Sequence, residues 1–160
     1  SPLMGVEMMQ PKVDWAQKHG INVQNIDLAD VKDTYDVVSL INVFSHIPDF
    51  DGFLKLIKKV MAKNGTLFLE TGNGADVGDR DNYPDLLYLP DHLMFGGVAQ
   101  ITQILERNGF RVTVTKSLRR DTLMFCIKQA VKKLIGRPGT FEIPYMSPFR
   151  TVFFRAERVK

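Results

Sequence analysis

The stretch YDVVSLINVFSHIPD, Tyr35–Asp49, decides the fold class of this chain. Its first part, Tyr35–Val43, is a nearly continuous apolar run, which is typical of a strand buried on both faces of a parallel sheet. Polar residues begin at Asn42, and Pro48 makes a loop more favourable than a helix for the residues around His46. The stretch therefore predicts a buried strand that ends in a loop.

Strand-like and helix-like segments alternate on both sides of this stretch. Upstream they are a strand over Leu3–Val6, a helix over Pro11–His19 and a strand over Ile21–Ile26. Downstream they are a helix from Phe50 to Met61 ended by Asn64-Gly65, a strand over Thr66–Thr71, helices over Gly97–Asn108 and Leu123–Ile135, and strands over Phe110–Thr115 and Thr151–Val159. This alternation predicts an α/β fold with a doubly wound, mostly parallel sheet and helices on both faces.

Length and composition indicate one globular domain over residues 1–160. The chain has 160 residues, of which 44% are hydrophobic and 24% charged, and these values are close to globular averages. Cys126 is the only cysteine, which excludes an internal disulfide and favours a reducing, cytoplasmic location. Neither a secretion signal nor a membrane span is indicated. No two of the three histidines have metal-ligand spacing, so we expect no metal.

The charge is distributed unevenly along the chain. Residues 1–100 hold 8 basic and 14 acidic side chains, and residues 101–160 hold 13 and 4. We expect most of this asymmetry to be neutralised within the domain, and no motif supports a specific nucleic-acid partner. The basic residues around the predicted helix Leu123–Ile135 leave open an anionic or membrane-bound ligand, although packing of that helix on the sheet is the simpler interpretation.

Candidate functional residues follow the predicted strands. In a doubly wound sheet ligands bind outside the carboxyl ends of the strands, where this sequence has Glu7, Asp27 and Asn42. The loop from Gly72 to Asp91, which includes Tyr83 and Tyr88, is long enough to indicate a functional or disordered segment. His46 and His92 lie in loops near these ends, and histidine titrates nearest neutrality.

From Gly5 to Val114 the chain resembles the class I S-adenosylmethionine-dependent methyltransferases of the small-molecule type. The quoted stretch is similar to that family's fourth strand and loop, D-V-V followed by N-V-L-E-H-V-P-D. The other matches are Gly5-Val6-Glu7 to the second strand, Asp27-Leu28 to the end of the third, Lys63–Asn73 to the fifth with its K-P-G-G entry, His92-Leu93-Met94-Phe95 to H-L-x-F, and Asn108-Gly109-Phe110 to A-G-F.

The resemblance implies methyl transfer from S-adenosyl-L-methionine to a small-molecule acceptor. It implies that Glu7 binds the ribose hydroxyls, that Asp27 meets the adenine amino group, and that Met8, Leu28, Asn42 and Val43 also line the cofactor site. His46 and His92 are the catalytic candidates, although a structural role in the loop remains an alternative for each. Residues 117–148 resemble a helical insertion between the last two strands, and the last strand is expected to be antiparallel between the family's fifth and sixth.

The family's glycine-rich signature, D-x-G-C-G-x-G on the first strand, has no counterpart here, since nothing precedes Ser1 in the sequence. We therefore expect a chain that lacks the first strand, is inactive alone, and can close its exposed sheet by homodimerisation. A non-catalytic, methyltransferase-like binding module is the alternative. A nicotinamide-binding Rossmann domain fits less well, because Asn42–Asp49 and Gly72-Asn73 match the methyltransferase pattern instead.

Overall fold

The computed structural model describes residues 3–72, 75, 92–118, 127–128, 131–132, 134–136 and 151–159. In chain order its elements are β1 (Gly5–Val6), α1 (Gln10–Lys18), β2 (Val23–Gln24), the 3-10 helix η1 (Leu28–Asp30), β3 (Tyr35–Ile41), the 3-10 helix η2 (Phe44–His46), α2 (Phe50–Val60), β4 (Met61–Gly72), α3 (Val98–Arg107), β5 (Phe110–Leu118) and β6 (Thr151–Arg158). The predicted loop from Gly72 to Asp91 and the expected insertion over residues 117–148 lie largely outside the described residues.

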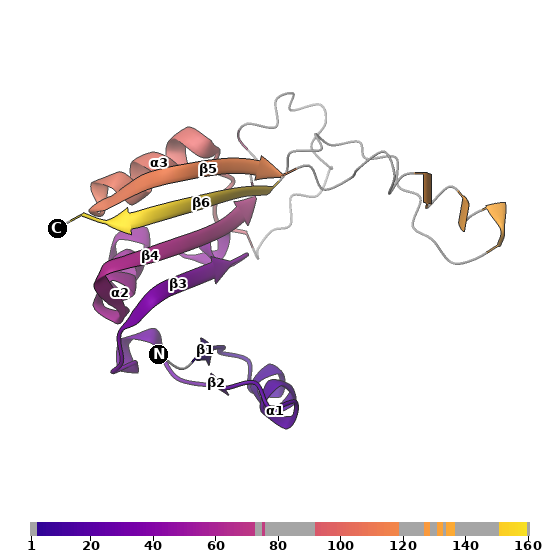
Figure 1. The fold of residues 1–160 in the computed structure, drawn as a ribbon, viewed down its shortest axis with the longest axis horizontal. Helices are drawn as coiled ribbons and strands as arrows, with labels where there is room; N and C mark the ends of the chain where they lie inside the picture. The colour runs from indigo at the N-terminus through magenta and orange to yellow at the C-terminus, as the bar shows by residue number, and fades with distance from the viewer. Residues whose placement is uncertain are drawn as a thin grey trace.

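The main sheet has the strand order β3-β4-β6-β5 (Figure 1). β3 and β4 are parallel, with Leu40 opposite Leu69. β6 is antiparallel to both of its neighbours, β4 and β5. The last strand of the chain therefore enters the sheet between two strands formed earlier in the sequence, which confirms the expected antiparallel last strand in a mixed α/β fold.

A second, shorter ladder joins β1 to β2 in parallel, with Gly5 opposite Val23. Figure 1 shows this pair and α1 on the β3 side of the main sheet. Two contacts connect the parts: the Tyr35 hydroxyl donates to Met4 Sδ at 3.5 Å, and Lys59 Nζ donates to the Ala29 carbonyl at 2.9 Å. The described part of the chain thus has a parallel two-stranded sheet and a mixed four-stranded sheet in place of the expected single sheet.

The core lies between one face of the main sheet and the helices α2 and α3. Both helices have a strongly amphipathic pattern, with lysines or other polar residues opposite the apolar side. The buried side chains that form this layer are Leu54 and Ile57 of α2, Ile101 and Leu105 of α3, and Leu40, Leu67, Leu69, Phe110, Val152, Phe154 and Ala156 of the sheet.

The opposite face of the sheet carries exposed apolar side chains. They are Val37 and Ile41 on β3, Phe68 on β4 and Val114 on β5. The prediction that the strand Tyr35–Val43 is buried on both faces is therefore wrong, because α2 and α3 both pack on the same face and none of the described helices covers the other. None of the described helices has the length and apolar character needed to cross a bilayer.

The boundary between α2 and β4 differs from the prediction. The helix ends at Val60 and the strand begins at Met61, so Asn64-Gly65 lies inside the strand instead of ending the helix. These residues lie in an irregularity of the β3–β4 ladder. Tyr35 pairs with Met61 and Val37 pairs with Thr66, so β4 has extra residues between the two pairs. Gly65 suits the irregularity because a Cβ there would lie 3.0 Å from the Ala62 carbonyl oxygen.

Candidate functional site

Asn42 marks the carboxyl end of β3. Its φ is 54°, a left-handed conformation that asparagine tolerates better than most residues. Its N–H donates to the Glu70 carbonyl at 3.1 Å, so the β3–β4 ladder continues to this residue. The turn at Asn42 ends the strand and leaves its side chain and that of Val43 exposed at the strand end, where the sequence predicted a ligand site.

Glu7 occupies the corresponding position after β1. Its N–H donates to the Gln24 carbonyl at 3.1 Å, which extends the β1–β2 ladder by one contact. One carboxylate oxygen accepts from the Met9 N–H at 2.9 Å, and the other lies 3.7 Å from Lys12 Nζ. The carboxylate is thereby oriented by its own loop while its side chain stays one-third exposed, and Met8 beside it is exposed.

Asp27 and Leu28 follow β2 and have local structural roles. Asp27 caps η1, because its Oδ1 accepts from the Ala29 N–H at 2.7 Å. Leu28 is half-buried against the core. These contacts give Asp27 a structural role as the cap of a short turn, and the predicted adenine contact stays a prediction.

The two catalytic candidates lie side by side. The rings of His46 and His92 have centroids 4.6 Å apart and an interplanar angle of 46°. His92 also stacks with Phe95 at 5.9 Å. The structure thus brings together two residues that are far apart in the sequence, and imidazole is the side chain that most often acts as a general acid or base.

The carbonyl of Ser45 holds this histidine pair in place. It accepts from the N–H groups of Leu93 at 2.8 Å and Met94 at 3.2 Å, so the residues after His92 are fixed to η2. Ser45 itself is buried, and its hydroxyl has no hydrogen-bond partner within the described residues. Sequence reasoning missed this anchor, because a backbone-to-backbone contact leaves no side-chain signal.

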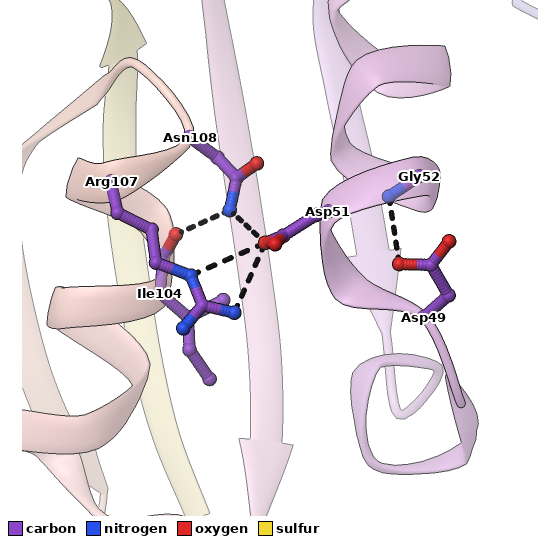
Figure 2. A network of polar contacts seen from close by, with 6 residues as sticks. All are labelled: Asp49, Asp51, Gly52, Ile104, Arg107 and Asn108. Carbon is purple, nitrogen blue, oxygen red and sulfur yellow. Dashed lines mark hydrogen bonds and ion pairs between the residues drawn. The ribbon is translucent and has the colours of Figure 1, made fainter.

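A polar network behind the site ties α2 to α3 (Figure 2). Asp51 Oδ1 accepts from Asn108 Nδ2 at 2.7 Å and from Arg107 Nη2 at 3.0 Å, and Asn108 also donates to the Ile104 carbonyl at 2.9 Å. The Asn108 hydrogen bond, followed by those from Arg107, lowers the pKa of Asp51. At the start of α2, Asp49 caps the helix by accepting from the Gly52 N–H at 3.0 Å.

The predicted residues therefore fall into separate groups. Glu7 and Met8 lie at the end of β1, Asp27 and Leu28 at the end of β2, and Asn42, Val43 and the histidine pair at the end of β3. Three or more potential metal ligands do not gather anywhere in the parts of the chain that the structure describes. The arrangement offers an acceptor for hydroxyl groups at one strand end and a proton-accepting pair at another.

Comparisons with known proteins agree on the family. A model described as "Methyltransferase domain" matches residues 2–115, whereas no curated protein sequence matches. Among solved structures, an S-adenosylmethionine dependent methyltransferase from Mesorhizobium loti superposes with a TM-score of 0.64 at 13% identity, over 97% of this chain and 80% of that one. The cyclopropane synthase MmaA2 from Mycobacterium tuberculosis gives 0.66 at 15%, over 97% and 69%.

The same fold also occurs with another activity. The [4+2]-cyclase SpnF gives a TM-score of 0.65 at 13% identity, over 98% of this chain and 65% of that one. At such identities the superpositions show the fold alone, and the family follows from the match over residues 2–115. That match covers more than half of the chain and confirms the resemblance drawn from Gly5–Val114, so the chain belongs to a methyltransferase-domain family.

Proposed function

We propose that this protein transfers a methyl group from S-adenosyl-L-methionine to a small-molecule acceptor. The observation that carries the proposal is the placement of Glu7, Asn42 and His46 after parallel strands, with His92 against His46, in a chain of the methyltransferase-domain family. Ligands of doubly wound folds bind at this position.

The residues at the end of β1 fit the adenosine half of the cofactor. The Glu7 carboxylate accepts from the Met9 N–H at one oxygen and lies 3.7 Å from Lys12 Nζ at the other, and an ionised carboxylate has further acceptor sites for two ribose hydroxyls. Met8 is an exposed apolar neighbour for the adenine ring. Asp27, Leu28, Asn42 and Val43 complete the proposed binding set. When bound, the cofactor supplies a methyl group on a sulfonium, and the protein supplies alignment and exclusion of water.

The histidine pair is proposed to act on the acceptor. His92 stacks on Phe95 and meets His46 at a ring-centroid distance of 4.6 Å, so either imidazole is a candidate to take the proton from an acceptor hydroxyl. Residues 117–148 are proposed as an insertion that shapes the acceptor side, since β5 and β6, which flank them, pair with each other.

Calorimetric titration with S-adenosylhomocysteine tests the cofactor assignment. Removing a hydrogen bond to a charged group costs about 1.5 to 3 kcal/mol, so Glu7→Ala is expected to weaken binding about 10- to 150-fold. Glu106→Ala, an exposed glutamate on α3, is the matched control and is expected to leave the affinity unchanged. An unchanged affinity of Glu7→Ala would remove Glu7 from the site. No binding by either this chain or a version extended upstream by native sequence would favour a non-catalytic binding module.

The histidine assignment needs an activity readout. Release of S-adenosylhomocysteine is measured with a panel of hydroxyl- and amine-bearing small molecules over a range of pH. His92→Gln and His46→Gln are expected to lower the rate with hydroxyl acceptors about 10²- to 10⁴-fold, as for loss of a general base. His19→Gln is the control, because His19 stacks on Trp15 at the end of α1. A full rate in both variants would leave the pair with a structural role.

We also propose a cytoplasmic homodimer with no nucleic-acid partner. A single cysteine supports the reducing location. β3 is an edge strand of its ladder, and such an edge can pair with a second copy. Light scattering after size-exclusion chromatography tests the dimer, and a monomeric mass at micromolar concentration would exclude it.

A further inference from the structure

The described residues between β5 and β6 present an apolar stripe to solvent. Residues 127–128, 131–132 and 134 are helical, and the Ile135 N–H donates to the Val131 carbonyl at 3.1 Å, one helical turn back. The apolar side chains recur at helical spacing, with exposed fractions of 50% for Ile127, 49% for Val131, 85% for Leu134 and 61% for Ile135. These exposures argue against the simpler interpretation that the helix packs on the sheet, and an exposed apolar stripe indicates an interaction surface.

The charge next to the stripe indicates the kind of partner. Lys128 and Lys132 are four positions apart in the sequence, and both are helical residues. In the sequence, positions 119–137 hold six basic residues and a single acidic one, Asp121. A helix with an apolar side bordered by lysines binds in the interface of a bilayer, and anionic headgroups add attraction for each lysine.

The stripe is also connected to the edge of the sheet that carries the candidate site. β5 ends at Leu118 and β6 begins at Thr151, and these two residues are paired. Thr151 also pairs with Gly72, the last residue of β4. The segment therefore leaves the sheet at the carboxyl end of β4, which is parallel to β3 and so shares this edge with Asn42. Figure 1 shows its orange pieces beyond this end of the sheet.

We propose that the lipid-facing stripe, defined as Ile127, Val131, Leu134 and Ile135 together with Lys128 and Lys132, docks on the surface of an anionic lipid bilayer. Docking orients the candidate site towards the membrane. If the protein has the proposed methyltransferase function, its methyl acceptor is an amphiphilic molecule that resides in the membrane interface. This statement about the acceptor rests on the proposed function, whereas the docking does not.

Vesicle sedimentation of the full chain tests the docking. The protein is mixed at low salt with vesicles of phosphatidylcholine alone, or of phosphatidylcholine with phosphatidylglycerol. We expect it to pellet with the anionic vesicles and to be released by salt, because screening weakens the attraction. Pelleting with neither kind of vesicle, or equal salt-resistant pelleting with both, would overturn the proposal.

Two matched pairs of variants locate the surface. Leu134→Glu is expected to weaken vesicle binding at least about tenfold, through loss of apolar burial. Leu3→Glu is its control, because Leu3 is also 85% exposed. The double change Lys128→Gln and Lys132→Gln is expected to weaken binding about 25-fold, from about 1 kcal/mol for each lysine. The control is the double change Lys18→Gln and Lys32→Gln, because both of these lysines are exposed and lie outside the stripe. Equal losses in variant and control would refute the assignment.

Cofactor titration separates this inference from the proposed function. Leu134→Glu is expected to bind S-adenosylhomocysteine as the parent chain does. If the parent binds anionic vesicles through the stripe but binds no S-adenosylhomocysteine, the proposed function fails and the docking surface stands. If it binds S-adenosylhomocysteine but no vesicles, the docking surface fails alone.

Discussion

Replacement of two phenylalanines on opposite faces of the main sheet tests whether only one face is buried in the core, because the two losses of unfolding free energy can be compared. Phe154 on β6 is 1% exposed and belongs to the core under α2 and α3, whereas Phe68 on β4 is 42% exposed on the other face. Phe154→Ala removes a fully buried ring and is expected to destabilise the protein by about 3 to 5 kcal/mol. Phe68→Ala loses only partial burial and leaves no closed cavity, so about 1 kcal/mol is expected.

Urea denaturation followed by far-ultraviolet circular dichroism provides the assay. With a slope of about 2 kcal/mol per molar urea, the midpoint is expected to fall by about 2 M for Phe154→Ala and by about 0.5 M for Phe68→Ala. If Phe154→Ala does not fold, Phe154→Leu and Phe68→Leu give the same comparison on a smaller scale. Equal midpoint shifts would show that both faces are covered and would refute the one-sided core.

Three further changes test local features. The pKa of Asp51 is lowered by Asn108 and Arg107, so the contribution of this carboxylate to stability is present above its unfolded pKa and is lost as pH falls through its folded pKa. We therefore expect the difference in unfolding free energy between the parent and Asp51→Asn to shrink below about pH 4. Urea denaturation from pH 7 to pH 2 measures this difference. Asn42→Gly is expected to keep the melting temperature, whereas Asn42→Val is expected to cost about 1 to 2 kcal/mol at the left-handed φ; equal melting temperatures would contradict that conformation. Asp49→Ala removes the cap of α2 and is expected to cost about 1 kcal/mol, and no change in the urea midpoint would show that the cap contributes nothing.

The regular elements could be predicted because their apolar spacing is local. Leu54 and Ile57 recur at the spacing of a buried helix face, and Phe110–Thr115 alternates as a strand does. The end of α2 could not be predicted in this way. Asn64-Gly65 is an ordinary helix stop, but β4 pairs with β3 from Met61 onwards and takes the chain into a strand earlier. Tertiary pairing here overrides a local turn signal.

Single residues of the candidate site could be predicted, but the contacts between them could not. Glu7, Asn42 and His46 were found from their positions after strands, whereas nothing in the sequence indicates that His92 lies beside His46. Their meeting depends on the carbonyl of Ser45, a group that every residue carries. In the same way, Asn108 and Asp51 are 57 residues apart, and only the packing of α3 on α2 makes them partners.

The position of β6 has a consequence for how the protein folds during synthesis. β4 and β5 are formed earlier in the chain, but each pairs with β6 and not with the other. Arg158, the last residue of β6, also donates to the carbonyl of Lys58, 100 residues upstream. On the ribosome, β5 therefore cannot join the sheet of β3 and β4 until the distal strand is available. Such distant pairings slow folding, and the buried faces of α2 and α3 stay available to chaperones until β6 has emerged.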